Sequence, residues 1–160
     1  MLTVTQATEA DVPALALLMD ELDRFYGAVA VDSPEQREEQ IRDALFGSRP
    51  AAYALLAEDD GELLGFASYS LLWPAAGVSS SLFLKELYVR QDRQRQGVGR
   101  LLMQALGETA VKTGCSRLEW QTDADNEQAK QFYRALGARI HPSKVFYRLE
   151  GEDLRRMAQR

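Results

Sequence analysis

Hydrophobic and polar residues recur along this chain with two different periods, which together predict a mixture of strands and helices. Alternation over residues 2–7 predicts a short strand, and apolar residues at helical spacing predict a helix over 8–26. Thr8, followed by acidic residues, is typical of the start of that helix. A second helix is predicted to begin after Ser33 and to end near Phe46, because Ser33-Pro34-Glu35-Gln36 combines a cap, a first-turn proline and a capping-box glutamine.

The middle of the chain predicts a hairpin followed by a buried strand. The apolar runs 53–58 and 63–71 flank Asp59-Asp60-Gly61, and Asp-Gly is typical of a tight turn between antiparallel strands. Residues 82–89 are apolar on both faces, as expected of a strand in a sheet that is covered on both sides. A glycine-containing loop follows, and then a helix whose apolar residues share one face: Leu102, Ala105, Leu106 and Ala110.

The last third of the chain predicts two strands and two helices. The strands cover residues 118–122 and 145–149, a helix starting at Asp125-Asn126 ends at Gly137, and residues 151–160 form a short polar helical tail. The order of elements predicts an α/β fold with one mixed sheet and helices on both of its faces. No repeat or linker divides the chain, so we expect a single domain over residues 1–160.

Composition excludes several classes of protein. The chain has 160 residues, 46% of them hydrophobic, and a net charge of −5, which argues against nucleic acid as a partner. No apolar run is long enough to span a membrane, and residues 1–6 lack the features of a secretory signal. The single Cys115 cannot form an internal disulfide, so we expect a cytoplasmic protein. The sequence contains no cluster of His, Cys and carboxylate residues with the spacing of metal ligands, so we expect no metal site.

The loop after the buried strand has the features of a phosphate or pyrophosphate site. It contains Gln94-x-x-Gly97-x-Gly99 directly before a helix, and the start of a helix offers unpaired N–H groups and a partial positive charge. Four arginines surround the glycines against one acid, Asp92: Arg90, Arg93, Arg95 and Arg100. A P-loop is excluded because no Lys-Ser/Thr pair follows the second glycine, and a dinucleotide fingerprint is excluded because position 102 is Leu.

Two motifs in this order resemble the GCN5-related N-acetyltransferase (GNAT) superfamily. The first is Gln94–Gly99, similar to the loop that holds the diphosphate of acetyl-coenzyme A. The second is residues 126–138, similar to the N-x-x-A-x-x-F-Y-x-x-x-G-A segment of the same superfamily. The resemblance implies the GNAT fold, with acetyl-CoA as co-substrate. In that fold a single mixed, mostly antiparallel sheet is splayed between its fourth and fifth strands, here 84–89 and 118–122.

Further segments resemble the diamine (spermidine/spermine-type) N-acetyltransferase branch: residues 84–89, 117–120, 147–154 and the helix end at Phe25-Tyr26. This implies acetyl transfer to a primary amine of a small molecule, diamine-like or amino-acid-like, by a homodimer. Two other interpretations stay open at this stage. One is a protein N-terminal or lysine acetyltransferase, and the other is an acyl-CoA sensor without turnover.

The resemblance assigns roles position by position. Residues that match cofactor-binding positions are Leu87, Tyr88, Val89, Gln94, Arg95, Gln96, Gly97, Val98, Gly99, Arg100, Asn126, Ala129, Lys130 and Tyr133. Phe25 and Tyr26 match substrate-binding positions, and Lys85 and Glu86 stand where the branch has two adjacent acids. Tyr133 matches the tyrosine that protonates the departing thiolate.

The candidate catalytic residues also have structural interpretations. An alkyl amine has a pKa of about 10.4 and must lose a proton before it attacks a thioester. Glu86, beside an apolar strand, is the candidate base acting through water, or else a structural carboxylate. Tyr133 is the candidate acid, or else a core aromatic of its helix, and Asn126 can serve as a helix cap.

The sequence departs from the branch at two positions that face the amine. Lys85 replaces the first of the adjacent acids, and Tyr26 replaces a further acid. Loss of two carboxylates argues against polyamine specificity. A substrate with one reacting amine and a carboxylate of its own would suit Lys85 better.

Overall fold

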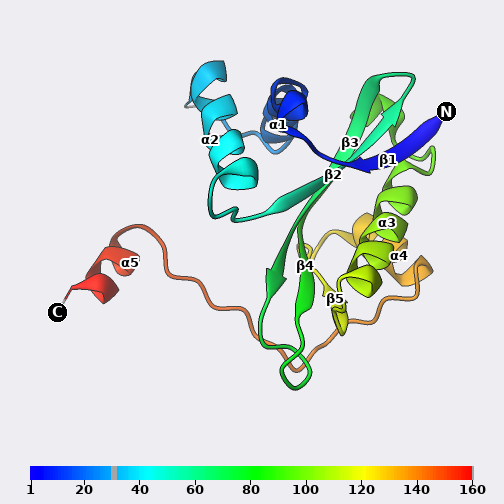
Figure 1. Ribbon diagram of the computed structural model, residues 1–160. Coiled ribbons are helices and arrows are strands. Elements are labelled where there is room, and N and C mark those ends of the chain that lie inside the picture. The colour runs from blue at the N-terminus through cyan, green and yellow to red at the C-terminus, as the bar shows by residue number, and fades with distance from the viewer. Residues whose placement is uncertain (30–31, 160) are drawn as a thin grey trace. The chain divides into compact units, whose positions relative to one another are not determined.

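The computed structural model describes residues 1–29 and 32–159, which form two compact units (Figure 1). The first unit is Met1–Gln121 and the second begins at Thr122. The first unit contains five strands: β1 (Leu2–Gln6), β2 (Tyr53–Asp59), β3 (Glu62–Leu72), β4 (Ser81–Val89) and β5 (Arg117–Glu119). It also contains the helices η1 (Glu9–Asp11), α1 (Val12–Phe25), α2 (Pro34–Phe46), η2 (Gln91–Arg93) and α3 (Val98–Lys112). The second unit contains α4 (Glu127–Ala135) and α5 (Gly151–Ala158).

The five strands form one sheet in the order β1-β2-β3-β4-β5. Neighbouring strands are antiparallel except β4 and β5, which are parallel. Leu56, Phe66 and Tyr88 lie side by side in the registers of β2, β3 and β4. The predicted mixed, mostly antiparallel sheet is therefore confirmed.

Strand β5 pairs with only the first part of β4. The register joins Ser81–Phe83 to Arg117–Glu119 and stops there. On that edge, residues 84–89 pair with no strand of the described chain, so the sheet opens where the splay is expected. A free strand edge presents backbone N–H and C=O groups that a bound molecule can use.

Helices cover both faces of the sheet in Figure 1. On one face, α1 and α2 pack their apolar residues, among them Val12, Leu15 and Ile41, against Phe66 and Tyr88. On the other face, α3 packs against β2, β3 and β4 and buries residues at helical spacing: Val98, Leu102, Leu106 and Ala110. Full burial of each large apolar side chain contributes about 1.5–3 kcal/mol, so these two layers hold the sheet in place.

Local signals in the sequence correctly predict several boundaries. Ser33 and Gln36 form the predicted capping box at the start of α2, and Thr8 forms one with Asp11 at the start of η1. Between β2 and β3, Asp60 and Gly61 both have positive φ, 48° and 81°, as the tight turn requires. The strand predicted over 118–122 is found as β5, which is shorter and begins one residue earlier.

The strand predicted over residues 145–149 is wrong. These residues form no strand, and Val145, Phe146 and Tyr147 are exposed at 74%, 62% and 87%. Their apolar pattern favours a strand, but a strand also needs a neighbour to pair with, and none of the described segments pairs with this one. In the described part of the chain, no helix is both long and apolar enough to cross a membrane.

Candidate functional site

The loop between β4 and α3 leaves the first turn of α3 open. Gly97 is the N-cap of α3 with φ of +86°, and no side chain caps the helix start. A Cβ built on Gly97 would meet no atom within 4 Å, so the space beside this residue is empty of protein. The first N–H groups of α3, at Val98, Gly99 and Arg100, can therefore reach an anion.

The arginines of this loop fall into two groups. Arg90 contacts Glu62 at 2.5 Å and Asp92 at 3.3 Å, and Arg93 contacts Glu62 at 2.8 Å. Arg95 and Arg100 form no ion pair with any carboxylate in the described residues. The loop is therefore less positively charged than the sequence predicts, because Glu62 neutralises part of the charge of Arg90 and Arg93. Two arginines, Arg95 and Arg100, remain available for a ligand.

Glutamines of the loop hold its backbone. The Gln94 side chain donates to the Val89 carbonyl at 3.2 Å, and the Gln96 side chain donates to the Asp92 carbonyl at 3.4 Å. Both residues are predicted to bind the cofactor, and these contacts give them a structural role within the loop as well.

Lys85 and Glu86 lie at a β-bulge. Glu86 is opposite Ser68 and Leu84 is opposite Tyr69, so Lys85 is the extra residue in β4. A bulge changes the direction of the side chains next to it. Lys85 is exposed, whereas Glu86 is partly buried, two positions before Tyr88 and on the face of the strand that Tyr88 presents to α1.

Burial raises the pKa of Glu86 above its ordinary value. Lys85 lowers it and Asp23 raises it, both less than the burial does. A carboxylate with a raised pKa is a stronger base, which suits a group that accepts a proton. The role of Glu86 as the base stays a prediction.

Tyr88 connects the sheet to α1. Its hydroxyl donates to Glu21 at 3.1 Å, and burial together with this contact raises the pKa of Tyr88 to about 12. Tyr88 therefore stays protonated at neutral pH. The ring of Phe25 lies 6.4 Å from that of Tyr88 and 5.2 Å from that of Tyr26, so the predicted substrate residues of α1 gather beside β4.

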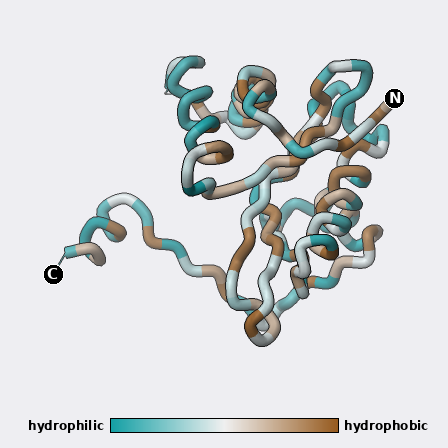
Figure 2. Tube along the Cα trace, viewed as in Figure 1, coloured by the Kyte–Doolittle hydropathy of each residue, from teal (hydrophilic) through white to brown (hydrophobic). Residues whose placement is uncertain are grey.

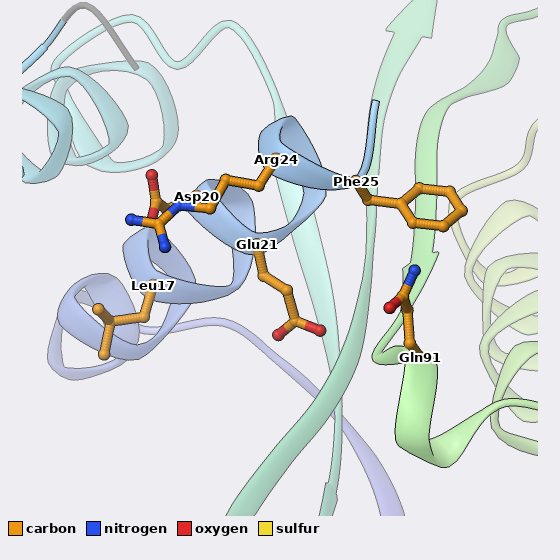
Figure 3. Close-up of a pocket in the computed structure, with 6 residues that line it drawn as sticks. All are labelled: Leu17, Asp20, Glu21, Arg24, Phe25 and Gln91. Atoms are coloured by element: carbon orange, nitrogen blue, oxygen red, sulfur yellow. The ribbon is translucent and has the colours of Figure 1, made fainter. Parts of the chain in front are cut away.

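A cleft of about 570 Å³ lies beside α1 (Figure 3). Its lining consists of Leu17, Asp20, Glu21, Arg24, Phe25 and Gln91. Arg24 pairs with Asp20 at 2.9 Å. Of these residues the sequence analysis assigned a site role only to Phe25, because helical spacing shows which residues face the core but not which partly buried acids line a cleft.

The remaining predicted residues lie in the second unit. The Asn126 side chain accepts a hydrogen bond from the Ala129 N–H at 3.1 Å, which confirms that Asn126 caps α4. Lys130 pairs with Glu127 at 3.2 Å, and the rings of Phe132 and Tyr133 lie 5.3 Å apart. Cofactor contacts of Asn126, Ala129, Lys130 and Tyr133 stay predictions.

The model of the acetyltransferase (GNAT) family matches residues 15–138. The chain belongs to this family. It is 26% identical to a thialysine N-epsilon-acetyltransferase of Sus scrofa, over 97% of this chain and 96% of that protein. It is 32% identical to an aminoglycoside N(6')-acetyltransferase type 1 of Stenotrophomonas maltophilia, over 92% of each chain.

Solved structures share the fold of this acetyltransferase. An integron cassette protein from the mobile metagenome of V. cholerae superposes with a TM-score of 0.91 at 26% identity, over 99% of this chain and 98% of the other. The aminoglycoside N-acetyltransferase AAC(6')-Iy in complex with CoA gives a TM-score of 0.76 at 19% identity, over 94% and 96%. The chain is an acetyl-CoA-dependent amine N-acetyltransferase.

The loop fits the diphosphate of this co-substrate. It combines uncapped N–H groups at the start of α3, open space beside Gly97, and the cations Arg95 and Arg100, which pair with no described carboxylate. When bound, acetyl-CoA supplies the thioester whose acetyl group is transferred. The cytoplasmic location stays a prediction.

Proposed function

We propose that this acetyltransferase acts on a primary amine of a small molecule that also carries a carboxylate, such as a side-chain amine of a diamino acid. The observation that carries the proposal is the bulge at Lys85-Glu86. It places an exposed cation next to a partly buried carboxylate. Both lie in the part of β4 whose edge is not paired with β5, where the sheet opens. Glu86 would receive the reacting ammonium group, and Lys85 would receive the carboxylate of the same molecule.

In this proposal the chain moves two protons. Glu86 accepts a proton from the ammonium group through water, because an amine with a pKa of about 10.4 is protonated at neutral pH. The free amine attacks the thioester carbonyl, whose oxygen becomes negative and accepts hydrogen bonds from backbone N–H groups of residues 87–89. As the carbon–sulfur bond breaks, the nitrogen releases its second proton to water and becomes the amide nitrogen, while Tyr133 gives its proton to the departing sulfur and later regains one from water.

The relatives support a small amine as the acceptor. The name of the Sus scrofa relative specifies the epsilon amine of thialysine, and that of the Stenotrophomonas relative specifies the 6' amine of an aminoglycoside. Both are small molecules, which favours this class over a protein N-terminus or a lysine in a protein. Retention of Tyr133, Asn126 and the whole loop argues against a sensor without turnover.

A panel of amines tests the proposal through release of free CoA thiol. The panel contains lysine, ornithine, thialysine, spermidine, an aminoglycoside and a lysine-containing peptide. We expect the highest kcat/KM with an amino acid that has a side-chain amine. Preference for spermidine would overturn the role of Lys85, preference for the peptide would move the chain to the protein acetyltransferases, and no turnover with any amine would favour a sensor.

We also propose that the enzyme is a homodimer in which residues 145–149 contact a second copy. Figure 2 marks hydrophobic residues in this segment, whose side chains at Val145, Phe146 and Tyr147 are exposed. In α5, Leu154 and Met157 are exposed as well, one helical turn apart. Such an apolar stretch is typical of a protein interface.

Light scattering tests the proposed dimer. The wild-type protein should have the mass of a dimer, and the double variant Phe146→Ser/Tyr147→Ser should shift that mass toward the monomer. A monomeric wild-type protein would refute the proposal.

A further inference from the structure

Glu62 contacts the loop of residues 90–100, which fits the diphosphate of acetyl-CoA. It is the first residue of β3, directly after the hairpin turn, and its two carboxylate oxygens contact two different arginines of the loop. One oxygen accepts from Arg90 and the other accepts from Arg93 at 2.8 Å. A single side chain from another strand therefore holds both the residue that follows β4 and the last residue of η2.

The two arginines are committed to protein contacts. Arg90 also contacts Asp92 at 3.3 Å and Glu21 at 3.9 Å, and its backbone N–H donates to the Leu64 carbonyl at 2.9 Å. The Nε atoms of Arg90 and Arg93 are buried from solvent. Guanidinium groups held in this way would have to break ion pairs before they could contact a phosphate.

We propose that Glu62 is a positioning residue for the co-substrate. It uses Arg90 and Arg93 to fix the start of the loop, so that Gly97, Arg95 and the first N–H groups of α3 are already in place when the diphosphate arrives. Preorganisation of this kind improves affinity because less conformational entropy is lost on binding. The proposal rests on acetyl-CoA as co-substrate and not on the identity of the amine.

Electrostatics alone predicts that Glu62 weakens the binding of CoA, which is the opposite of the effect proposed here. A carboxylate near an anion site repels the anion, so replacing it by a neutral residue should tighten CoA binding. A positioning carboxylate predicts weaker binding after the same replacement, because the loop becomes less ordered. The sign of the change in affinity therefore separates the two roles.

The experiment measures CoA affinity of the free protein by calorimetry for the wild type and Glu62→Gln. We expect the Kd to rise roughly fivefold, as the loss of two partly exposed ion pairs suggests. Hydrogen exchange of the amides of residues 91–97, measured without CoA, should become faster in the same variant. The amide of Gly107, inside α3, should exchange at an unchanged rate.

Glu58→Gln is the matched control. It makes the same chemical change in the same hairpin, at a residue whose Cα partner in β3 is Leu63 and which forms no ion pair within the described residues. The Kd of this control should stay unchanged. An unchanged or lower Kd in Glu62→Gln, or unchanged exchange in the loop, would overturn the proposal.

A second variant tests the same point if Glu62→Gln fails to fold. Arg93→Gln removes one of the two contacts with Glu62. If Arg93 acts through the loop, the Kd rises while the dependence of the Kd on salt concentration stays as in the wild type. If Arg93 contacts the diphosphate, that dependence becomes weaker, because one cation of the anion site is lost, and the proposal is wrong.

Discussion

The donor side and the acceptor side of this enzyme are built in different ways. The proposed donor side is the loop of residues 90–100, which begins directly after β4 and ends in the first turn of α3. It is made of consecutive residues, and its main groups for the ligand are backbone N–H groups at Gly97 and beyond. The proposed acceptor side consists of side chains from separate segments: Phe25 and Tyr26 at the end of α1, and Lys85 and Glu86 at the bulge of β4.

This difference suggests which part of the site depends on the identity of side chains and which part does not. Backbone groups serve any chain that folds in this way, so the donor side can bind one co-substrate throughout a family. The acceptor side depends on which side chain occupies each position, as the exposed Lys85 beside the partly buried Glu86 illustrates. A change on the donor side should therefore alter the affinity for CoA, and a change on the acceptor side should alter the response to the amine.

The largest effect is expected at Tyr133, which we propose takes part in the chemical step. Tyr133→Phe removes the hydroxyl that we propose protonates the departing thiolate, so kcat should fall about a hundredfold. The Kd for acetyl-CoA should change little, because the ring remains. Phe132→Tyr, which adds a hydroxyl at the adjacent residue, tests whether a neighbouring hydroxyl matters. Steady-state rates and calorimetry measure both quantities, and an unchanged kcat in Tyr133→Phe removes Tyr133 from the mechanism.

The next largest effect is expected at Glu86, on the acceptor side. Glu86→Gln removes the proposed proton acceptor, and kcat/KM for the amine should fall roughly thirtyfold, since water can relay part of the proton transfer. Burial raises the pKa of Glu86. The wild-type activity should therefore decrease as the pH falls through that raised pKa, because the protonated carboxyl accepts no proton. Glu86→Gln should lose this acidic limb of the pH profile, and retention of the limb would assign it to another group.

Much of the fold could be predicted from the sequence because its signals are local. The capping box at Ser33 and the Asp60-Gly61 turn each depend on a few adjacent residues, and both are found. The strand predicted over 145–149 shows the limit of such signals. Its apolar pattern is local, but formation of a strand depends on a partner elsewhere, and residues 145–149 form none in the structure.

In the candidate site, too, local features could be predicted from the sequence and contacts between distant segments could not. The glycine loop could be found from its spacing, because consecutive residues carry it. The contacts of Glu62 with Arg90 and Arg93 could not, because they join the start of β3 to the loop after β4, two segments that are far apart in the sequence. The bulge at Lys85 was also missed, since one extra residue in a strand leaves no sign in an apolar pattern.

A smaller effect is expected at Gly97, on the donor side. Its φ of +86° is unfavourable for any residue with a Cβ, although space for a Cβ is open. Gly97→Ala should therefore raise the Kd for CoA about fivefold to tenfold through backbone strain, with the KM for the amine nearly unchanged. Gly107→Ala is the control, because Gly107 lies inside α3, has no positive φ, and also has nothing within 4 Å of a built Cβ. Equal effects of the two substitutions would show that α3 matters only as a helix.

The smallest effect is expected at Lys85, which we propose distinguishes one class of amine from another. Lys85 is exposed, so its attraction for a substrate carboxylate is screened by water and salt. Lys85→Glu should lower kcat/KM for an amino acid with a side-chain amine about threefold to fivefold and raise it for spermidine by a similar factor. The Kd for CoA should stay the same, because the loop is unchanged. Lys85→Gln, which removes the charge without reversing it, should lie between the wild type and Lys85→Glu for both amines. If both amines respond in the same direction, Lys85 acts on the bulge or on Glu86 and not on the substrate, because only direct contact with substrate charge gives opposite signs.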